Sequence, residues 1–170
     1  MCVSIPLCRR NQKNIVATEI ERKFLVIGDE WRSLASGTEY RQGYITAGNG
    51  KTVRVRLVGE QGYLTIKGKS TGLSRLEFEY LIPKTDVEEM LDALCDRPPV
   101  CKTRYKIPIG DLVWEVDEFA GENEGLIIAE VELTHEQQEV ARPKWVGDEV
   151  TFDRRYYNSY LAHYPFKSWG

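Results

Sequence analysis

Charged and apolar side chains alternate residue by residue in seven stretches of this chain. In the first, TEIERKFLV at 18–26, Glu19, Glu21 and Lys23 occupy every second position. Successive side chains of a β-strand point to opposite faces of a sheet, so this stretch predicts a strand with one charged and one apolar face. The same alternation predicts strands at 52–58, 62–68, 74–82, 100–110, 112–121 and 126–133, and the run at 39–46 completes a set of eight. The short, turn-rich gaps between several of them favour antiparallel hairpins.

The charged face of these strands is unusual in composition. A solvated sheet face commonly mixes Thr, Ser, Gln and Lys, whereas here nearly every polar position carries a full charge. Eight positions are basic and eight are acidic: Lys23, Arg54, Arg56, Lys67, Arg75, Lys102, Arg104 and Lys106 against Glu19, Glu21, Glu77, Glu79, Glu115, Asp117, Glu130 and Glu132. An ion-pair ladder on a solvated sheet is one explanation. The other is a sheet that curls with its charged face around a hydrated tunnel, for which about eight strands suffice.

Helices are expected between and after the strands. Thr85 and Glu88 form a capping-box pattern, and the apolar stripe that follows predicts a helix that ends before Pro98. Shorter helices are expected at three further places: around Trp31, from Thr134 to Pro143, and after Asp153. The last one carries a stripe that we interpret as core packing, made of Tyr156, Tyr157, Tyr160, Leu161 and Tyr164. With helices covering the apolar face, we expect an α+β fold, an eight-stranded antiparallel closed β-barrel that forms a tunnel.

Length and charge limit the class of protein. A chain of 170 residues suits one domain, which we place at 18–170 after a leader at 1–17 that we expect to be disordered. The net charge of −3 argues against a nucleic-acid partner or an anionic membrane surface. No apolar run approaches the length of about 18 residues that a membrane span needs. Four cysteines without a C-x-x-C pair favour reduced thiols and a cytoplasmic location.

The types of charge indicate what a tunnel would hold. Arg recognises phosphate oxygens with its bidentate fork, and Lys does so as a point charge. Two carboxylates two residues apart lie about 7 Å from each other along a strand. With a facing pair they can hold Mg²⁺ or Mn²⁺, hard ions that prefer oxygen ligands and share their waters with phosphates. Basic and acidic groups in one tunnel therefore indicate a metal-bound polyphosphate.

Several short motifs in a fixed order resemble those of one enzyme family. The sequence EIERK at 19–23 is similar to the E-x-E-x-K signature of the CYTH superfamily, also called triphosphate tunnel metalloenzymes. Supporting motifs are RVR at 54–56, TIKG at 65–68, KTRY at 102–105, EVDEF at 115–119 and EVEL at 130–133. The ending EVTFDRRYYNSYLA resembles that of short, single-domain members similar to inorganic triphosphatases. The resemblance runs from residue 18 to about 165, and it implies an eight-stranded tunnel, cleavage of a triphosphate and dependence on Mg²⁺ or Mn²⁺.

The resemblance also implies roles for individual residues. The metal ions, two per site, would be held by Glu19, Glu21, Glu130 and Glu132, with Glu77, Glu79 and Asp117 as further ligands or as groups that support the ligands. The triphosphate would be bound, and its cleavage catalysed, by Lys23, Arg54, Arg56, Lys67, Lys102 and Arg104. Arg75 and Arg155 are additional candidates for phosphate binding. Tyr44 is a candidate for tuning Lys102 by a hydrogen bond, although Gly43 could mark a bulge that turns Tyr44 away.

The reaction is not fixed by family resemblance. We expect metal-dependent hydrolysis of inorganic triphosphate to pyrophosphate and phosphate, because the inward strand positions are almost all charged. A base or thiazole would need an aromatic platform, for which Trp31, Tyr40 and Tyr63 are candidates, although we interpret Trp31 as a core residue. The alternatives are therefore adenylate cyclase, a thiamine or nucleoside triphosphatase, and a non-catalytic polyphosphate-binding module. A homodimer fits the resemblance.

Overall fold

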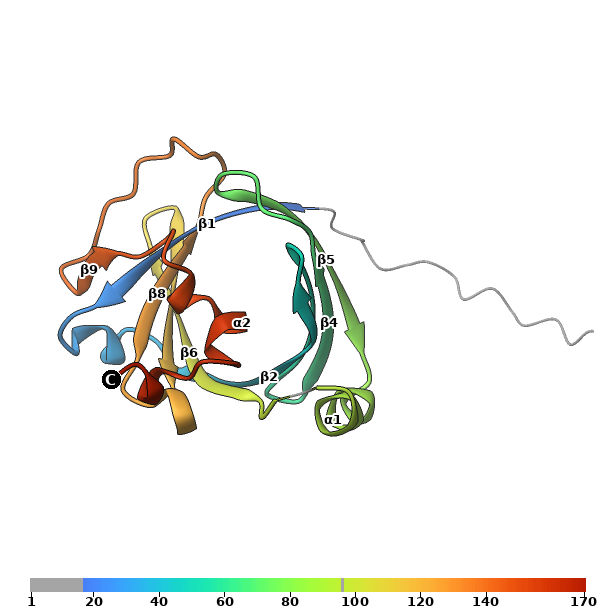
Figure 1. Ribbon diagram of the computed structural model, residues 1–170. Coiled ribbons are helices and arrows are strands. Elements are labelled where there is room, and N and C mark those ends of the chain that lie inside the picture. Colours follow the sequence, from blue (N-terminus) through green and yellow to red (C-terminus); the bar gives the residue numbers. More distant parts are fainter. Residues whose placement is uncertain (1–16, 96) are drawn as a thin grey trace, which may run out of the picture.

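The protein is built around a ring of eight antiparallel strands. The computed structural model describes residues 17–95 and 97–170, so residues 1–16 of the expected leader lie outside the described residues. The eight strands are β1 (Ala17–Val26), β2 (Gly37–Gly48), β3 (Lys51–Val58), β4 (Gln61–Lys67), β5 (Ser74–Ile82), β6 (Val100–Ile109), β7 (Leu112–Phe119) and β8 (Ile127–Glu132). Viewed along the tunnel, the ribbons enclose a central space (Figure 1). The expected closed barrel is confirmed.

One strand closes the ring by pairing with two others. The order around the ring is β5-β4-β3-β2-β6-β7-β8-β1, and β1 returns to β5. The first residues of β1, Ala17 to Ile20, pair with β5, and the later residues, Glu21 to Leu25, pair with β8. All of these pairings are antiparallel, and the β2–β3 hairpin turns at Asn49 and Gly50, which both have a positive φ. Asn-Gly is the preferred pair for such a turn because the turn requires positive φ at both positions.

A ninth strand lies outside the ring and is absent from the sequence-based expectation. This strand, β9 (Val146–Glu149), pairs with the end of β1 through Phe24 and Val26. The segment leading to it brings Trp145 against Trp114 on β7, with ring centroids 5.7 Å apart. Because Trp114 is fully buried, this segment covers the outer apolar face of β1, β7 and β8. The described residues from 134 to 142 form turns and loop, so the helix expected after Thr134 is wrong.

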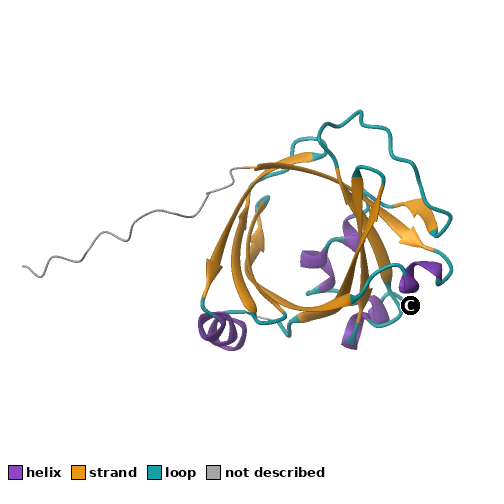
Figure 2. Ribbon diagram, turned by 180° about the vertical axis from the view of Figure 1, so that it is seen from behind, coloured by secondary structure: helices purple, strands orange, loops and turns teal. Residues whose placement is uncertain are grey.

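The longer helix covers the opposite side of the ring. Helix α1 (Lys84–Ala93) buries Val87 and Leu91 against Val55 of β3 on the outside of the barrel (Figures 1 and 2). It begins directly after Pro83, and no side chain caps it, so the capping box expected at Thr85 is wrong. Pro83 is the N-cap residue, with φ −56° and ψ 142°, and its missing N–H costs nothing there because the first N–H groups of a helix have no partner within the helix.

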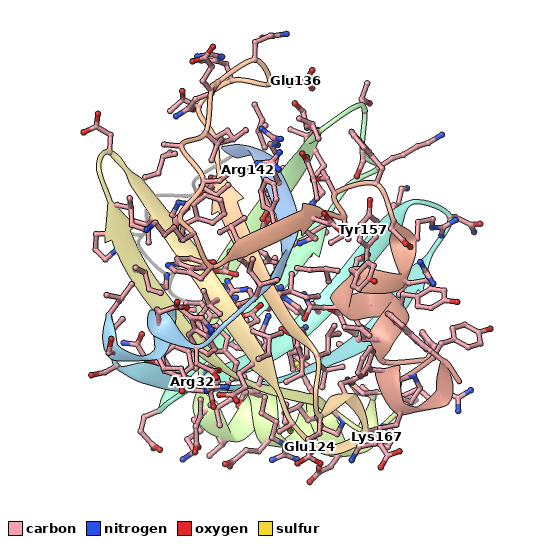
Figure 3. All side chains as sticks on the ribbon, turned by 90° about the vertical axis from the view of Figure 1, so that its left-hand side faces the viewer. Arg32, Glu124, Glu136, Arg142, Tyr157 and Lys167 are labelled. Carbon is pink, nitrogen blue, oxygen red and sulfur yellow. The ribbon has the colours of Figure 1, made fainter. Side chains whose placement is uncertain are left out.

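The remaining helices are short. They are η1 (Glu30–Ser33), η2 (Gly121–Asn123), η3 (Arg154–Tyr156), α2 (Asn158–Leu161) and η4 (Phe166–Ser168). Trp31 in η1 is fully buried, and the side chain of Asp153 caps η3 as expected. In Figure 3, Glu136 marks one end of the molecule, and Glu124 and Lys167 mark the opposite end. Within the described residues, no helix is long and apolar enough to cross a membrane.

Candidate active site

The ring encloses a cavity that gathers the charged face of the strands. The cavity has a volume of about 710 Å³, within the range common for ligand sites. All eight basic residues of the predicted charged face line it, as do seven of the eight acidic ones. The eighth, Asp117, is fully buried behind the lining, where it binds Lys102 and Arg104. The alternation along the strands therefore becomes a tunnel lined with charges.

On the wall formed by β6, β7 and β8, the basic side chains are held by carboxylates. Arg104 Nε and Nη2 donate hydrogen bonds of 2.5 Å to Asp117. Nη2 also donates to Glu130 at 2.7 Å, and Nη1 donates to Glu115. Burial opposes the charge of Arg104, but Asp117 and Glu130 outweigh burial and raise the pKa of Arg104 well above its usual value. Every nitrogen of this guanidinium group is engaged.

On the wall formed by β3, β4 and β5, the two arginines of β3 are less completely paired than Arg104. Arg54 Nη2 donates to Thr65 Oγ1 at 3.1 Å, and the closest carboxylate oxygens lie 3.6 Å away on Glu79 and 4.0 Å away on Glu77. Arg56 Nη2 donates to Glu79 at 2.9 Å. The Nε atoms of Arg54 and Arg56 are buried and have no hydrogen-bond partner among the described residues. Burial and the charge of Arg56 lower the pKa of Arg54. No carboxylate of the described residues lies within hydrogen-bond distance of Arg54, so the positive charge of this arginine is not fully neutralised by its neighbours.

Strand β1 links the two walls. Its Glu19 accepts hydrogen bonds from Lys67 of β4 at 2.9 Å and from Arg75 of β5 at 2.7 Å. Its Lys23 donates to Glu130 of β8 and lies 3.0 Å from Glu21. Burial opposes the charge of Glu19, but Lys67 and Arg75 outweigh burial and lower its pKa. The E-x-E-x-K motif thus places its three charges between the walls at the closure of the barrel.

Carboxylates are in excess at the end of β8. Glu132 lies opposite Glu21 in the β1–β8 register. Burial, together with the charges of Glu19, Glu115 and Glu21, raises the pKa of Glu132. Among the described residues, no three His, Cys, Asp or Glu side chains form a ready-made metal site. The oxygen donors and their mutual repulsion nevertheless fit a hard divalent cation, because such an ion would offset the repulsion.

The C-terminal segment closes one part of the tunnel, which the sequence did not predict. Asn158 at the start of α2 accepts a hydrogen bond of 3.2 Å from Lys102 Nζ. Burial and the nearby charge of Arg104 lower the pKa of Lys102 to about 8. Asn158 and Tyr157 line the cavity, and α2 lies inside the outline of the ring (Figure 1). The helical stripe pointed to Leu161, which is buried in a core cluster, but nothing in it marked Asn158.

Tyr44 is one of the residues that line the tunnel. The Tyr44 hydroxyl accepts a hydrogen bond of 2.8 Å from Gln42 rather than bonding Lys102, and burial raises its pKa to about 12. The register shift expected at Gly43 falls after Tyr44 instead, between Tyr44 and Thr46. Gly43 has another reason to be glycine, because a Cβ there would lie 2.8 Å from Leu91 of α1.

Arg155, Trp31 and Tyr164 lie away from the tunnel lining. Arg155 pairs with Asp153 at 2.6 Å, and its side chain is 57% exposed. Trp31 packs in the outer core against Tyr105, with ring centroids 4.9 Å apart. Tyr164 is exposed and Tyr157 lines the cavity, so the interpretation of these two residues as core packing was wrong. Tyr40, by contrast, is buried and lines the tunnel.

Comparison with known proteins identifies the family. A family model described as the CYTH domain matches residues 17–160. The chain belongs to the CYTH family. A protein named inorganic triphosphatase from Acetivibrio thermocellus is 54% identical over 150 residues, which cover 88% of this chain and 96% of that protein. A protein of the same name from Nitrosomonas europaea is 42% identical over 150 residues, covering 85% and 97%.

Solved structures share the fold of this CYTH domain. A crystal structure of an inorganic triphosphatase has a TM-score of 0.61 and 37% identity, and the match covers 86% of this chain and 95% of that chain. A Hippeastrum protein described as a putative adenylyl cyclase with a dominant triphosphatase activity has a TM-score of 0.55 at 16% identity, covering 69% and 80%. At that identity the second match concerns the fold alone. The predicted family is confirmed.

Proposed function

We propose that this CYTH protein hydrolyses inorganic triphosphate to pyrophosphate and phosphate inside its tunnel. The observation that carries the proposal is Arg54 of β3, which lines the cavity with its guanidinium N–H donors and has no carboxylate oxygen closer than 3.6 Å among the described residues. A triphosphate supplies acceptor oxygens and negative charge for such donors. The relative of 54% identity named inorganic triphosphatase supports the same reaction.

The proposed reaction is an in-line displacement. A water oxygen attacks the terminal phosphorus, the bond from that phosphorus to the bridging oxygen breaks, pyrophosphate leaves, and the proton of the water passes to solvent. Arg54, Arg56 and Lys67 neutralise charge on the equatorial and leaving oxygens as it develops. Lys102, which faces them from β6, extends this basic surface. These four cations are the groups that we assign to the substrate first.

The other predicted site residues support this surface. Lys23, Arg75 and Arg104 line the same cavity and, like Arg56, Lys67 and Lys102, bind carboxylates, so we assign to them both phosphate binding and the placement of those carboxylates beside the substrate. Glu77 and Glu79 orient Lys67 and Arg56 in the same way. Asp117 is fully buried between two cations and therefore acts as their counter-ion rather than as a metal ligand. Arg155 pairs with Asp153 outside the lining and has no part in the proposed site.

A divalent cation completes the proposal. We assign its binding to four carboxylates: Glu19, Glu21, Glu130 and Glu132. Mg²⁺ or Mn²⁺ at these residues would lower the pKa of the attacking water and neutralise phosphate charge. The raised pKa of Glu132 supports this assignment, because its carboxylate is surrounded by like charges that a cation would balance.

Phosphate release from a panel of triphosphates tests the proposed function. With Mg²⁺ or Mn²⁺ present, we expect kcat/KM for inorganic triphosphate to exceed that for ATP and for thiamine triphosphate by at least about 10-fold. Removal of divalent cations with EDTA should abolish turnover. Formation of cyclic AMP and pyrophosphate from ATP would instead establish a cyclase, and binding of all three compounds without turnover would establish a binding module.

A further inference from the structure

A single aromatic ring lies among three of the tunnel cations. Tyr40 is on β2, and its side chain is only 7% exposed. Its ring centroid is 5.6 Å from Arg56 Cζ, 5.4 Å from Arg104 Cζ and 5.9 Å from Lys102 Nζ. Each distance is within about 6 Å, the range in which a cation is attracted to the face of an aromatic ring. Tyr40 is thus the shared neighbour of cations from both walls.

The position of β2 in the ring explains this arrangement. Strand β2 lies between β3, which carries Arg56, and β6, which carries Lys102 and Arg104. Tyr40 is directly opposite Lys102 in the β2–β6 register. Its ring therefore lies between a cation of β3 and two cations of β6.

An aromatic ring affects a cation differently from a carboxylate. A carboxylate holds a cation by neutralising it, as Glu79 does with Arg56 at 2.9 Å. The ring quadrupole attracts the cation without adding a negative charge, so the positive charge remains available to an anion. An aliphatic side chain of similar size would fill the same space without this attraction.

We propose that Tyr40 is a positioning residue that holds Arg56, Lys102 and Arg104 together as a basic surface for the triphosphate. Without the ring, the carboxylate that holds Arg56 is Glu79 and those that hold Arg104 are Asp117, Glu115 and Glu130, so no side chain on β2 would tie the cations of the two walls to each other. The surface would then be split into two separate walls. The inference rests on the proposed function, because it concerns binding of the same substrate.

Tyr63 is a second aromatic residue near these cations, and it contacts fewer of them than Tyr40 does. Its ring centroid is 5.3 Å from Arg56 Cζ, on the side of β4, and its hydroxyl donates to Gln61 at 2.8 Å. Tyr63 therefore contacts one of the three cations, whereas Tyr40 contacts all three. If the attraction to the ring matters, the loss of Tyr63 should have a smaller effect than the loss of Tyr40.

The test uses Tyr40→Phe, Tyr40→Leu and Tyr63→Leu in the whole protein. Binding of inorganic triphosphate is measured by calorimetry in EDTA, and KM and kcat are measured with Mg²⁺. For Tyr40→Leu we expect Kd and KM to rise about 10-fold, with a smaller change in kcat, since 10-fold corresponds to about 1.4 kcal/mol and lies within the range of cation–π contacts. Tyr63→Leu should raise Kd about 3-fold. Tyr40→Phe should stay within about 2-fold of wild type, because it keeps the ring.

Any of the following results would contradict the inference about Tyr40. An equal loss of triphosphate affinity in Tyr40→Phe and Tyr40→Leu would show that the hydroxyl, and not the ring, positions the cations. Wild-type affinity in Tyr40→Leu would show that Tyr40 has no positioning role. A change in kcat alone would also contradict it. Should Tyr40→Leu fail to fold in a melting experiment, Tyr40→Met is judged by the same criteria. A wild-type protein that neither binds nor hydrolyses inorganic triphosphate would refute the proposed function itself.

Discussion

Arg54 and Arg104 show how the two walls of the tunnel differ. Both face inward from their strands, and both side chains are almost completely buried. All three guanidinium nitrogens of Arg104 bond to carboxylates, whereas Arg54 bonds to the hydroxyl of Thr65 and its Nε has no partner among the described residues. The alternation in the sequence decides which face a charge occupies. It does not decide whether neighbouring side chains neutralise that charge or leave it to bind a ligand.

The paired wall should be the one on which stability depends. We expect Asp117→Asn to lower the free energy of unfolding by about 3 kcal/mol, because it leaves Lys102 and Arg104 buried without their shared carboxylate. Denaturant unfolding of the purified variant measures this. Glu115→Gln is the matched control on the same strand: its side chain is 25% exposed, and Arg104 keeps its other bonds. We expect the control to cost less than about 1 kcal/mol, and an equal cost for both variants would contradict the distinction between buried and partly exposed pairs.

The less completely paired wall should matter for activity and hardly for stability. We expect Arg54→Ala to lower kcat/KM for inorganic triphosphate at least about 100-fold, equivalent to about 2.7 kcal/mol of transition-state stabilisation. The free energy of unfolding should change by less than about 1 kcal/mol. Burial and Arg56 lower the pKa of Arg54, so its charge is disfavoured in the folded protein and its removal relieves that cost.

Arg142→Ala serves as the control for Arg54→Ala. Arg142 is a partly exposed arginine outside the tunnel lining, where it lies 3.1 Å from Glu149. Its replacement should leave kcat/KM unchanged, which separates a local effect in the tunnel from a general loss of positive charge. A loss of stability in Arg54→Ala as large as that in Asp117→Asn would show that both walls are structural.

The barrel was predictable from the sequence because the alternation is a local property of each strand. Arg54 and Glu130 face inward for the same reason that Val55 and Val131 face outward. Strand β9 was missed because its four residues, VGDE, contain no alternation. Its position depends on Trp145, which packs against residues from distant strands. The early start of α1 likewise depended on Pro83 rather than on the capping box at Thr85.

The composition of the tunnel lining was predictable, but its pairing was not. Pairing depends on how strands neighbour each other around the ring, as when β1 brings Glu19 to Lys67 and Arg75. Asn158 carried no signal, because a single amide near a tyrosine-rich helix has no pattern. Tyr40 was noticed as an aromatic platform, yet its contact with three cations requires β2 to lie between β3 and β6.

At the end of β8 negative charge is in excess, whereas at Arg54 positive charge is in excess. Burial and the carboxylates of Glu19, Glu115 and Glu21 raise the pKa of Glu132. An acid with a raised pKa in the folded state binds its proton more tightly than the unfolded chain does. Its contribution to stability is therefore favourable at acidic pH and is lost as the pH rises from the ordinary pKa of a glutamate, 4.5, through the higher pKa of the folded state. At neutral pH without a cation, the charge of Glu132 costs stability.

Glu132→Gln should consequently stabilise the protein at pH 7 in EDTA, the smallest effect expected here. The gain should stay below about 1 kcal/mol, because Glu132 is exposed enough for water to screen its repulsion. At pH 4, where the carboxylate is mostly protonated, the melting temperatures of variant and wild type should coincide. Added Mg²⁺ should then raise the melting temperature of wild type more than that of the variant, since the ion balances a charge that only wild type carries. A variant less stable than wild type at pH 7 in EDTA would mean that neighbouring groups already neutralise the charge of Glu132. The excess of negative charge on β8 would then not match the excess of positive charge at Arg54 on β3.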